Sequence, residues 1–321
     1  MPYQKYLEEK VSCVLLSYNH VHTIEDTVKS VLKQKLKNFE FIISDDCSND
    51  GTWEKLINIK KKNNNIILKK TKTNIGMSGN TNYAFSLCSR PYIALLHHDD
   101  LYPSNLLEEW GKMLDKHREA AFVFNSYKNF ETNTISTFMP SEIIEGDWLI
   151  RNVLLSKLDC SIRGTCMVRK SAFDKVGGMN TKFGYIADID LWIRLAKKFP
   201  ACFSSKTIIT VKTQKPKYYT DNYLPYKNFW KKKKLLYSLY LKNIQEYKNS
   251  ILLKDKLLWY KYLFNVNKDI LYWIIYLLCK KKIYIILEIK QIFKIKEIFI
   301  ITRLLIFIII KMLKKRIYFN Y

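Results

Sequence analysis

The stretch YIALLHHDD, from Tyr92 to Asp100, decides how the first two thirds of this chain are interpreted. Its first five residues are apolar, which is typical of a strand buried on both faces of a parallel sheet. The run ends at Asp99 and Asp100, and open α/β sheets bind their ligands beyond the carboxyl ends of their strands. Two carboxylates at that place form a hard-oxygen site suited to Mg²⁺ or Mn²⁺ carrying a diphosphate.

The same two aspartates have an alternative role, because carboxylates also cap helices. Pro103 follows closely, and proline is common in the first turn of a helix, so a helix from Pro103 to His117 can begin here. Other stretches of the chain decide between a metal site and a cap.

Length and composition predict one large domain with an extension, or two domains, because the chain has 321 residues of which 48% are hydrophobic. The formal net charge of +25 is unevenly placed along the chain. Residues 224–321 hold 22 Lys and Arg against 5 Asp and Glu, a net charge of +17, whereas residues 1–223 carry only +8. We therefore predict a first domain over 1–223 and a separate basic region over 224–321.

Seven cysteines stand far apart in the sequence without a C-x-x-C pair. The odd number and the wide spacing argue against a disulfide framework and against a zinc site, and favour a reducing compartment. The N-terminus has no apolar segment of the signal-peptide type. These features predict a cytoplasmic protein.

Strand-like and helix-like segments alternate up to Asp100, which predicts a doubly wound α/β sheet. The expected strands are Val11–Leu16, Phe39–Ile43, Ile66–Leu68 and Tyr92–Leu96, and the expected helices begin after Thr23, at Thr52 and before Asn80. Further on, the sequence predicts a strand over Ala120–Asn125, a helix over Glu145–Lys157, and a strand and short helix over 164–178 that stop at two glycines.

Polar turns follow three of these strands, at Tyr18-Asn19, Asp45-Asp46 and Asp99-Asp100. Because the carboxyl ends of parallel strands meet at one edge of a sheet, these turns can line one crevice. A single aspartate after a strand is commonly only a turn residue, but two carboxylate pairs on one edge favour a binding site. The sequence contains no G-x-G-x-x-G or Walker A motif, so a metal on carboxylates would have to hold the phosphates.

Four segments of the first domain form a recognisable set: VSCVLLSYNH at 11–20, FEFIISDDCSNDGT at 39–52, NIG at 74–76 and ALLHHDD at 94–100. Together they resemble the family 2 glycosyltransferases, whose GT-A fold is a doubly wound mixed α/β sheet flanked by helices. The resemblance spans roughly residues 10–215. It implies a nucleoside diphosphate sugar as the donor, with a UDP-sugar favoured, a saccharide acceptor, and Mn²⁺ or Mg²⁺ as the cofactor.

The resemblance also implies roles for single residues. It places Tyr18 and Asp46 against the base of the donor, Asp99 toward the ribose, and Asp100 on the metal.

Histidine at position 97 is a departure, because many relatives have aspartate there. Imidazole can ligate Mn²⁺ but is a poorer partner for Mg²⁺. We interpret His97 and His98 as a strand-end pair, one pointing inward and one solvated, rather than as ligands.

The segment YIADIDLWIRL, at 185–195, has apolar residues around much of a helix and Asp188 at its start. The helix dipole favours a carboxylate at that place, which is one explanation for it. The family has E-D-x-D-L-W here, so the resemblance implies that Asp188 is the general base and that Ala187 replaces a glutamate. We expect Asp190 to be structural, paired with Arg194 one turn further on.

These parts predict a reaction that inverts the anomeric carbon. Asp188 would take the proton of the attacking hydroxyl, while a metal on Asp100 neutralises charge that grows on the diphosphate. One base without an enzyme nucleophile means a single displacement, and none of the seven cysteines has the setting of a nucleophile.

Residues 224–321 lie beyond the resemblance and predict a mostly α-helical region. Lysine clusters separate apolar stretches at 269–279, 283–289 and 298–310. The longest run has about 13 residues and contains Arg303, whereas a membrane-spanning helix needs about 20 apolar residues. We predict helices that lie on an anionic membrane surface, at the inner face of the cell membrane and within reach of a lipid-linked saccharide acceptor. A helical bundle with a lysine-rich solvated face is the alternative.

Two other functional classes fit parts of the sequence. A nucleic-acid-binding protein would use the basic C-terminal region, but the acidic sheet edge would repel phosphate without a metal, so we expect no nucleic-acid partner. A catalytically inactive homologue would act as a scaffold, but Asp46, Asp99, Asp100 and Asp188 are all retained.

Overall fold

A ten-stranded mixed β-sheet organises the part of the chain that the computed structural model describes, which is residues 2–136, 139–154, 162, 165–212 and 238–239. Its hydrogen-bonded order is β3-β2-β1-β4-β9-β6-β10-β5, with β7 paired to β6 and β8 paired to β10. The strands are β1 Val11–Ser17, β2 Glu40–Asp45, β3 Ile66–Lys70, β4 Tyr92–Leu96, β5 Asp100–Leu101, β6 Phe122–Asn129, β7 Ile135–Ser136, β8 Ile143–Ile144, β9 Cys166–Arg169 and β10 Ala201–Val211.

The half of the sheet that carries the polar turns is parallel. Strand β1 pairs in parallel with β2 and with β4, and β2 pairs in parallel with β3. Every residue of β1 and β4 is buried, which explains why these strands are apolar runs without alternation. Antiparallel β9 then lies between β4 and β6, so the sheet is mixed. The predicted mixed α/β sheet flanked by helices is confirmed.

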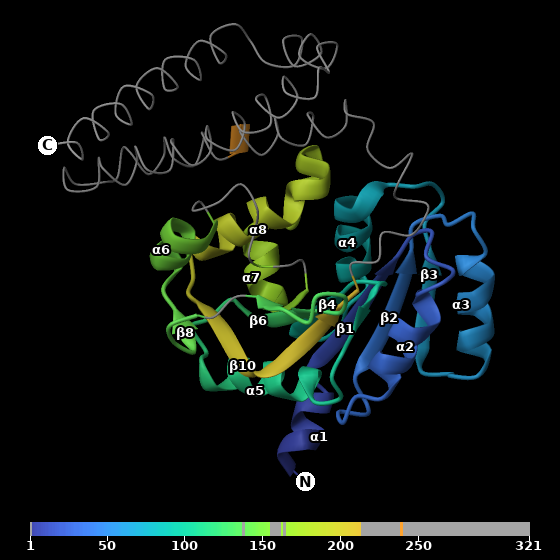
Figure 1. Cartoon of the computed structure of the whole chain (residues 1–321), viewed down its shortest axis with the longest axis horizontal. Helices are drawn as coiled ribbons and strands as arrows, with labels where there is room; N and C mark the ends of the chain where they lie inside the picture. Colours follow the sequence, from blue (N-terminus) through green and yellow to red (C-terminus); the bar gives the residue numbers. More distant parts are fainter. Residues whose placement is uncertain (1, 137–138, 155–161, 163–164, 213–237, 240–321) are drawn as a thin grey trace, which may run out of the picture. The chain divides into compact units, whose positions relative to one another are not determined.

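Helices cover both faces of this sheet (Figure 1). On one face, the core joins α1, α2 and α5 to the sheet through Leu7, Val28 and Trp110. On the other face, α8 stacks Trp192 on Phe122 of β6, with ring centroids 5.0 Å apart. The helices are α1 Pro2–Glu8, α2 Ile24–Leu32, α3 Thr52–Lys61, α4 Gly76–Ser86, α5 Leu106–Lys116, α6 Gly146–Leu149, α7 Lys170–Lys175 and α8 Ala187–Ala196, with a π-helical turn over Ile150–Leu154 and a 3₁₀ segment over Thr181–Ile186.

The alternative in which the aspartates of the YIALLHHDD stretch cap a helix is wrong. Asp100 begins strand β5, which pairs antiparallel with Thr210 and Val211 at the end of β10. Helix α5 begins only at Leu106, with Asn105 as its N-cap residue. The pairing partner lies more than 100 residues away in the sequence, so no local sequence pattern could predict this strand.

Other predicted boundaries differ from the structure by a few residues. Strand β2 continues to Asp45, so only Asp46 of that pair lies in the turn. The segment expected as a helix from Glu145 begins at Gly146 and changes to a π-helical turn, and residues 155–161 lie outside the described part of the chain.

The predicted basic helical region over 224–321 also lies outside the described residues, apart from Ser238 and Leu239. Within the described residues, none of the helices combines the length and apolar content that crossing a bilayer demands.

Candidate active site

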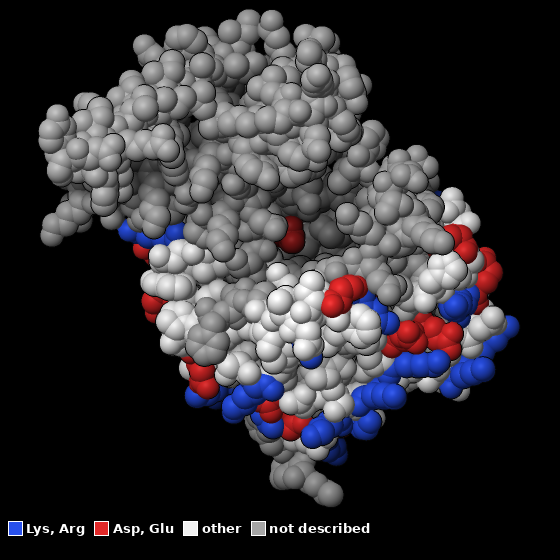
Figure 2. Space-filling view, viewed as in Figure 1, with Lys and Arg blue, Asp and Glu red and all other residues white. Residues whose placement is uncertain are grey.

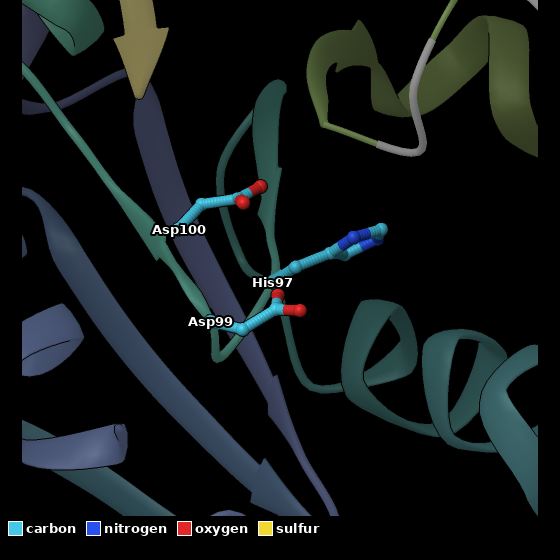
Figure 3. Close-up of side chains that lie close together, drawn as sticks. All are labelled: His97, Asp99 and Asp100. Atoms are coloured by element: carbon cyan, nitrogen blue, oxygen red, sulfur yellow. The ribbon is translucent and has the colours of Figure 1, made fainter. Parts of the chain in front are cut away.

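Three side chains with metal-ligating atoms gather where β4 ends and β5 begins. One ligand atom each of His97, Asp99 and Asp100 lies within 4.8 Å of the others. The Asp100 side chain is fully buried, whereas His97 and Asp99 are half-buried. All three project to the same side of the connection between the strands, as Figure 3 shows. The predicted pair Asp99 and Asp100 is thus joined by a residue that we did not expect to take part.

A buried tyrosine holds the backbone of this cluster at its first residue. The hydroxyl of Tyr102 accepts a hydrogen bond from the His97 N–H at 2.7 Å and donates one to the His97 carbonyl at 2.8 Å. Burial raises the pKa of Tyr102 well above its ordinary value, and the charges of Asp100 and Asp99 act in the same direction. The phenol therefore stays protonated at neutral pH and can donate this bond.

Two threonines of α2 hold the backbone of the cluster from the other side. Thr27 Oγ1 lies 2.9 Å from the His98 carbonyl and 3.0 Å from the Asp100 carbonyl. Thr23 occupies the N-cap position of this helix but turns its hydroxyl to the His98 carbonyl at 3.2 Å. The two carbonyls that flank Asp99 are therefore both fixed by a helix that packs beneath the turn.

His98 packs against a second histidine. Its Nδ1 lies 3.2 Å from the Leu16 carbonyl, and its ring stacks on His20 with centroids 3.4 Å apart. Burial lowers the pKa of both rings, in His20 to about 3 with a further contribution from His98, so the stacked pair is neutral at pH 7. The structure does not divide the pair into one inward and one solvated ring, because His97, beside the carboxylates, is half-buried like His98.

The earlier pair, after β2, is bound into its own turn. Asp45 is fully buried and accepts hydrogen bonds from the Ser48 N–H at 2.9 Å and the Ser48 hydroxyl at 2.5 Å. Asp46 Oδ1 accepts from the Ile75 N–H at 2.9 Å and from the Thr71 hydroxyl at 3.0 Å. Asp46 thereby connects the end of β2 to the loop that enters α4.

Tyr18 lies directly after β1, at the same edge of the sheet. The last residue of β1, Ser17, pairs with Asp45, and its carbonyl accepts the Asp46 N–H at 2.8 Å. The side chain of Tyr18 is half-buried. The two residues predicted to contact the base, Tyr18 and Asp46, thus follow neighbouring strand ends.

Asp188 lies in the first turn of α8, as predicted, and is half-buried. One of its oxygens accepts the N–H of Ile189 at 2.8 Å. Burial raises the pKa of the Cys166 thiol on β9, and the charge of Asp188 acts in the same direction. Cys166 pairs with Leu95 on β4. The thiol on which the charge of Asp188 acts therefore lies beside the end of β4.

The expected structural role of Asp190 is confirmed. Its Oδ2 lies 2.7 Å from Nε of Arg194. The same guanidinium donates to the carbonyls of Val176 at 2.6 Å and Gly178 at 2.7 Å. Gly177 and Gly178 have φ of +79° and +68°, a conformation that side chains with a Cβ disfavour, so the ion pair secures a turn that glycine permits.

Several positioning residues escaped the sequence analysis. Thr27 and Tyr102 are buried, and Asn82 of α4 exchanges two hydrogen bonds of 2.9 Å with the backbone of Met179. A polar residue on the inward face of a helix is the signal that could have found Thr27. It does not name the partner, which comes from a distant segment.

Comparison with known proteins agrees with this arrangement. Residues 12–177, more than half of the chain, match the family model described as glycosyl transferase family 2. The chain belongs to that family. It is 31% identical over 201 residues to the UDP-Glc:α-D-GlcNAc-diphosphoundecaprenol β-1,3-glucosyltransferase WfaP of Escherichia coli, an alignment that covers 59% of this chain and 71% of the relative. Across four curated relatives the chain covers between 55% and 72% of the relative's length.

Solved structures share the fold of this glycosyltransferase. Staphylococcus aureus TarS 1–349 in complex with UDP-GlcNAc has a TM-score of 0.57 at 15% identity, covering 81% of each chain. The mannosyltransferase PcManGT of Pyrobaculum calidifontis, in complex with GDP-Man and Mn²⁺, has a TM-score of 0.54 at 15% identity, covering 74% of this chain and 64% of that one. The GT-A fold expected from the four sequence motifs is confirmed.

Proposed function

We propose that this family 2 glycosyltransferase moves a sugar, with inversion, from a nucleoside diphosphate sugar to an acceptor hydroxyl. The observation that carries the proposal is the cluster of His97, Asp99 and Asp100 where β4 ends and β5 begins. A leaving diphosphate needs its charge neutralised and an acceptor needs a base. The cluster would hold the metal that neutralises the diphosphate, and Asp188 would be the base.

The donor would lie along the ends of β1, β2 and β4. We assign Asp46 and Tyr18 to the nucleobase of the donor, and Asp99 to its ribose. Asp46 supports this assignment because its bonds to Thr71 and Ile75 fix its carboxylate at the strand end. A UDP-sugar is the favoured donor, since WfaP is named for UDP-glucose and a TarS structure holds UDP-GlcNAc.

The residues present fit a divalent metal. Two carboxylates supply the oxygen donors that Mg²⁺ and Mn²⁺ accept, and the three ligand atoms lie within 4.8 Å of one another. Ligands about 2.1 Å from one ion lie up to about 4.2 Å apart, so small side-chain rotations would close the set. Asp100 is assigned as the principal ligand. When bound, the metal would supply charge neutralisation at the diphosphate.

Asp188 is assigned as the general base. Its place in the first turn of α8 and its half-buried carboxylate leave it able to take a proton from an acceptor hydroxyl. Burial raises the pKa of the thiols of Cys13, Cys88, Cys166 and Cys202, which is the opposite of what activates a cysteine nucleophile. A single displacement, and hence inversion, follows from one base acting alone.

The acceptor is proposed to be a lipid-linked saccharide, because WfaP is named for a diphosphoundecaprenol acceptor. The net charge of +17 over 224–321 supports a peripheral position on an anionic membrane at its cytoplasmic face. A nucleic-acid partner is not part of the proposal. On the face of the described unit shown in Figure 2, basic and acidic side chains are interspersed rather than gathered into a basic stripe.

A panel of nucleotide sugars with and without Mn²⁺, read by thermal shift, tests the donor. Binding raises the melting temperature in proportion to ln(1 + [L]/Kd), so the true donor should stand out only when Mn²⁺ is present. NMR of the product with a lipid-linked acceptor then reads the anomeric configuration. A panel in which no nucleotide sugar shifts the melting temperature would overturn the proposed donor site. Retention of configuration would overturn the single displacement.

Co-sedimentation with anionic liposomes tests the membrane proposal separately. Full-length protein should pellet at low salt, and a chain ending at residue 223 should stay in the supernatant while it still binds UDP. Full-length protein that stays in the supernatant would favour the helical bundle.

A further inference from the structure

We propose that His97 is a nitrogen ligand of the bound metal and that it makes this site select Mn²⁺ over Mg²⁺. The inference rests on the proposed metal-dependent donor site and names the residue that sets its metal preference. It assigns a function to a side chain that the sequence analysis left without one.

The geometry brings an imidazole nitrogen to the carboxylates. A ring nitrogen of His97 belongs to the set of ligand atoms that lie within 4.8 Å of one another. In Figure 3 the His97 ring extends to the same side as the carboxylates of Asp99 and Asp100. Three protein donors converging from one side leave the opposite side of an ion open, which is where a diphosphate would bind.

A buried hydroxyl holds both backbone polar groups of His97. The Tyr102 hydroxyl bonds both the N–H and the carbonyl of His97, at 2.7 and 2.8 Å. Tyr102 is itself buried, with 5% of its surface exposed. These two hydrogen bonds to one hydroxyl fix the backbone from which the His97 side chain projects. Such outer contacts orient metal ligands and tune their affinity.

The neighbouring histidines do not compete for this role. His98 uses Nδ1 toward the Leu16 carbonyl and stacks its ring on His20. Neither of them belongs to the cluster of metal-ligating atoms found among the described residues. His97 is thus the histidine of this turn whose ring joins the carboxylates.

The chemistry of the ligand atoms explains why this placement would favour Mn²⁺ over Mg²⁺. Mg²⁺ demands oxygen ligands and gives up its waters reluctantly, whereas Mn²⁺ accepts imidazole as well as carboxylate. Two carboxylates and a neutral imidazole together carry a charge of −2, which a divalent ion balances. A third carboxylate in place of His97 would supply a further hard oxygen and permit Mg²⁺.

Titration calorimetry on the full-length chain with saturating UDP tests the selectivity. The wild type should bind Mn²⁺ at least tenfold more tightly than Mg²⁺. His97→Ala should weaken Mn²⁺ binding at least tenfold, and His97→Asp should reduce the Mn²⁺-to-Mg²⁺ affinity ratio at least tenfold. His22→Asn is the matched control, because His22 is exposed and outside the cluster, and it should change neither affinity.

Pulsed electron paramagnetic resonance of bound Mn²⁺ reads the ligand directly. The wild type and His22→Asn should show ¹⁴N coupling from imidazole, and His97→Asp should lose it. Mn²⁺ that binds without ¹⁴N coupling, or coupling that persists in a folded His97→Asp variant, would overturn the inference while leaving the proposed donor site intact. A wild type that binds UDP but neither metal would overturn the inference and the metal dependence together, whereas failure to bind UDP at all would overturn the proposed function.

Discussion

The two aspartate pairs of the sheet edge both follow a buried parallel strand, yet they are embedded in different ways. Asp45 and Asp46 accept hydrogen bonds from their own turn and from the loop that enters α4. Asp99 and Asp100 instead gather with His97, while hydroxyls from α2 hold the carbonyls on either side of Asp99. The difference teaches that a carboxylate pair becomes a metal-site candidate when neighbouring elements satisfy its backbone and leave its side chains directed at one point.

If both aspartate pairs only bind the donor, another group must accept the proton of the acceptor hydroxyl. We expect Asp188→Asn to lower turnover about 10²–10⁴-fold, the usual effect of removing a general base, while donor affinity stays near that of the wild type. Steady-state kinetics and UDP titration measure the two effects. Asp174→Asn is the control, since Asp174 is an acid on α7 whose ion pair with Lys170 is partly exposed. Near-normal turnover in Asp188→Asn would place the base elsewhere.

Replacing one aspartate of each pair by asparagine tests whether the two pairs have different roles in UDP binding. Asp100→Asn should remove the Mn²⁺-dependent part of UDP affinity, at least tenfold, and leave the metal-free part unchanged. Asp46→Asn should weaken UDP binding equally with and without Mn²⁺, because its assigned contact is to the base. Titration calorimetry under both conditions separates the outcomes. An identical pattern in the two variants would show that the pairs do not differ as described.

Deleting the hydroxyl beneath the second pair tests whether its backbone support matters for metal binding. Thr27→Val keeps the shape but leaves the carbonyls of His98 and Asp100 without this donor, so we expect a loss of about 1–3 kcal/mol in the free energy of unfolding. Mn²⁺ affinity should fall severalfold, and Thr27→Ser should restore much of it. Urea unfolding and calorimetry give the two readouts. Loss of stability with unchanged Mn²⁺ affinity in Thr27→Val would make the hydroxyl merely structural.

His20 connects the two turns, and acid should reveal this connection. Its N–H bonds the Thr52 hydroxyl after the first turn, and its ring stacks on His98 of the second. Burial lowers the pKa of His20 from its ordinary 6.5 to about 3, so the unfolded chain binds the proton first. Stability should therefore fall as the pH drops from about 6.5 toward 3, by up to about 1.4 kcal/mol per pH unit from this residue.

His20→Phe, which keeps a flat ring without a titratable nitrogen, measures that contribution. Urea unfolding at pH 7, 6 and 5 should show a shallower loss of stability in this variant than in the wild type. The exposed His22→Asn serves as the control and should leave the slope unchanged. Parallel pH profiles for wild type and His20→Phe would contradict the neutral stacked pair.

The sequence alone was enough for β1 to β4, β6 and β9, because their information is local, whereas β5, β7, β8 and β10 were not predicted. A run such as Tyr92–Leu96 can only be buried on both faces, and polar residues after three such runs place three turns on one edge of a parallel sheet. The motifs at 11–20, 39–52, 74–76 and 94–100 likewise led to the GT-A fold, which the structure and the comparisons confirm. The helix that carries Asp188 and its Asp190–Arg194 pair were also predictable, since ion pairs one turn apart are a property of the helix itself.

The tertiary structure decided which side chains of those turns meet. Strand β5 exists because Asp100 pairs with the end of β10, and this pairing excludes the helix cap that the sequence allowed. Tyr102 and Thr27 fix the turn through carbonyls that no residue pattern identifies, and His97 joins the carboxylates because of that fixed backbone. Periodicity reports which face of an element is buried, but the partner on that face is chosen by packing between segments far apart in the chain. The grouping of His97, Asp99 and Asp100 depends on that choice.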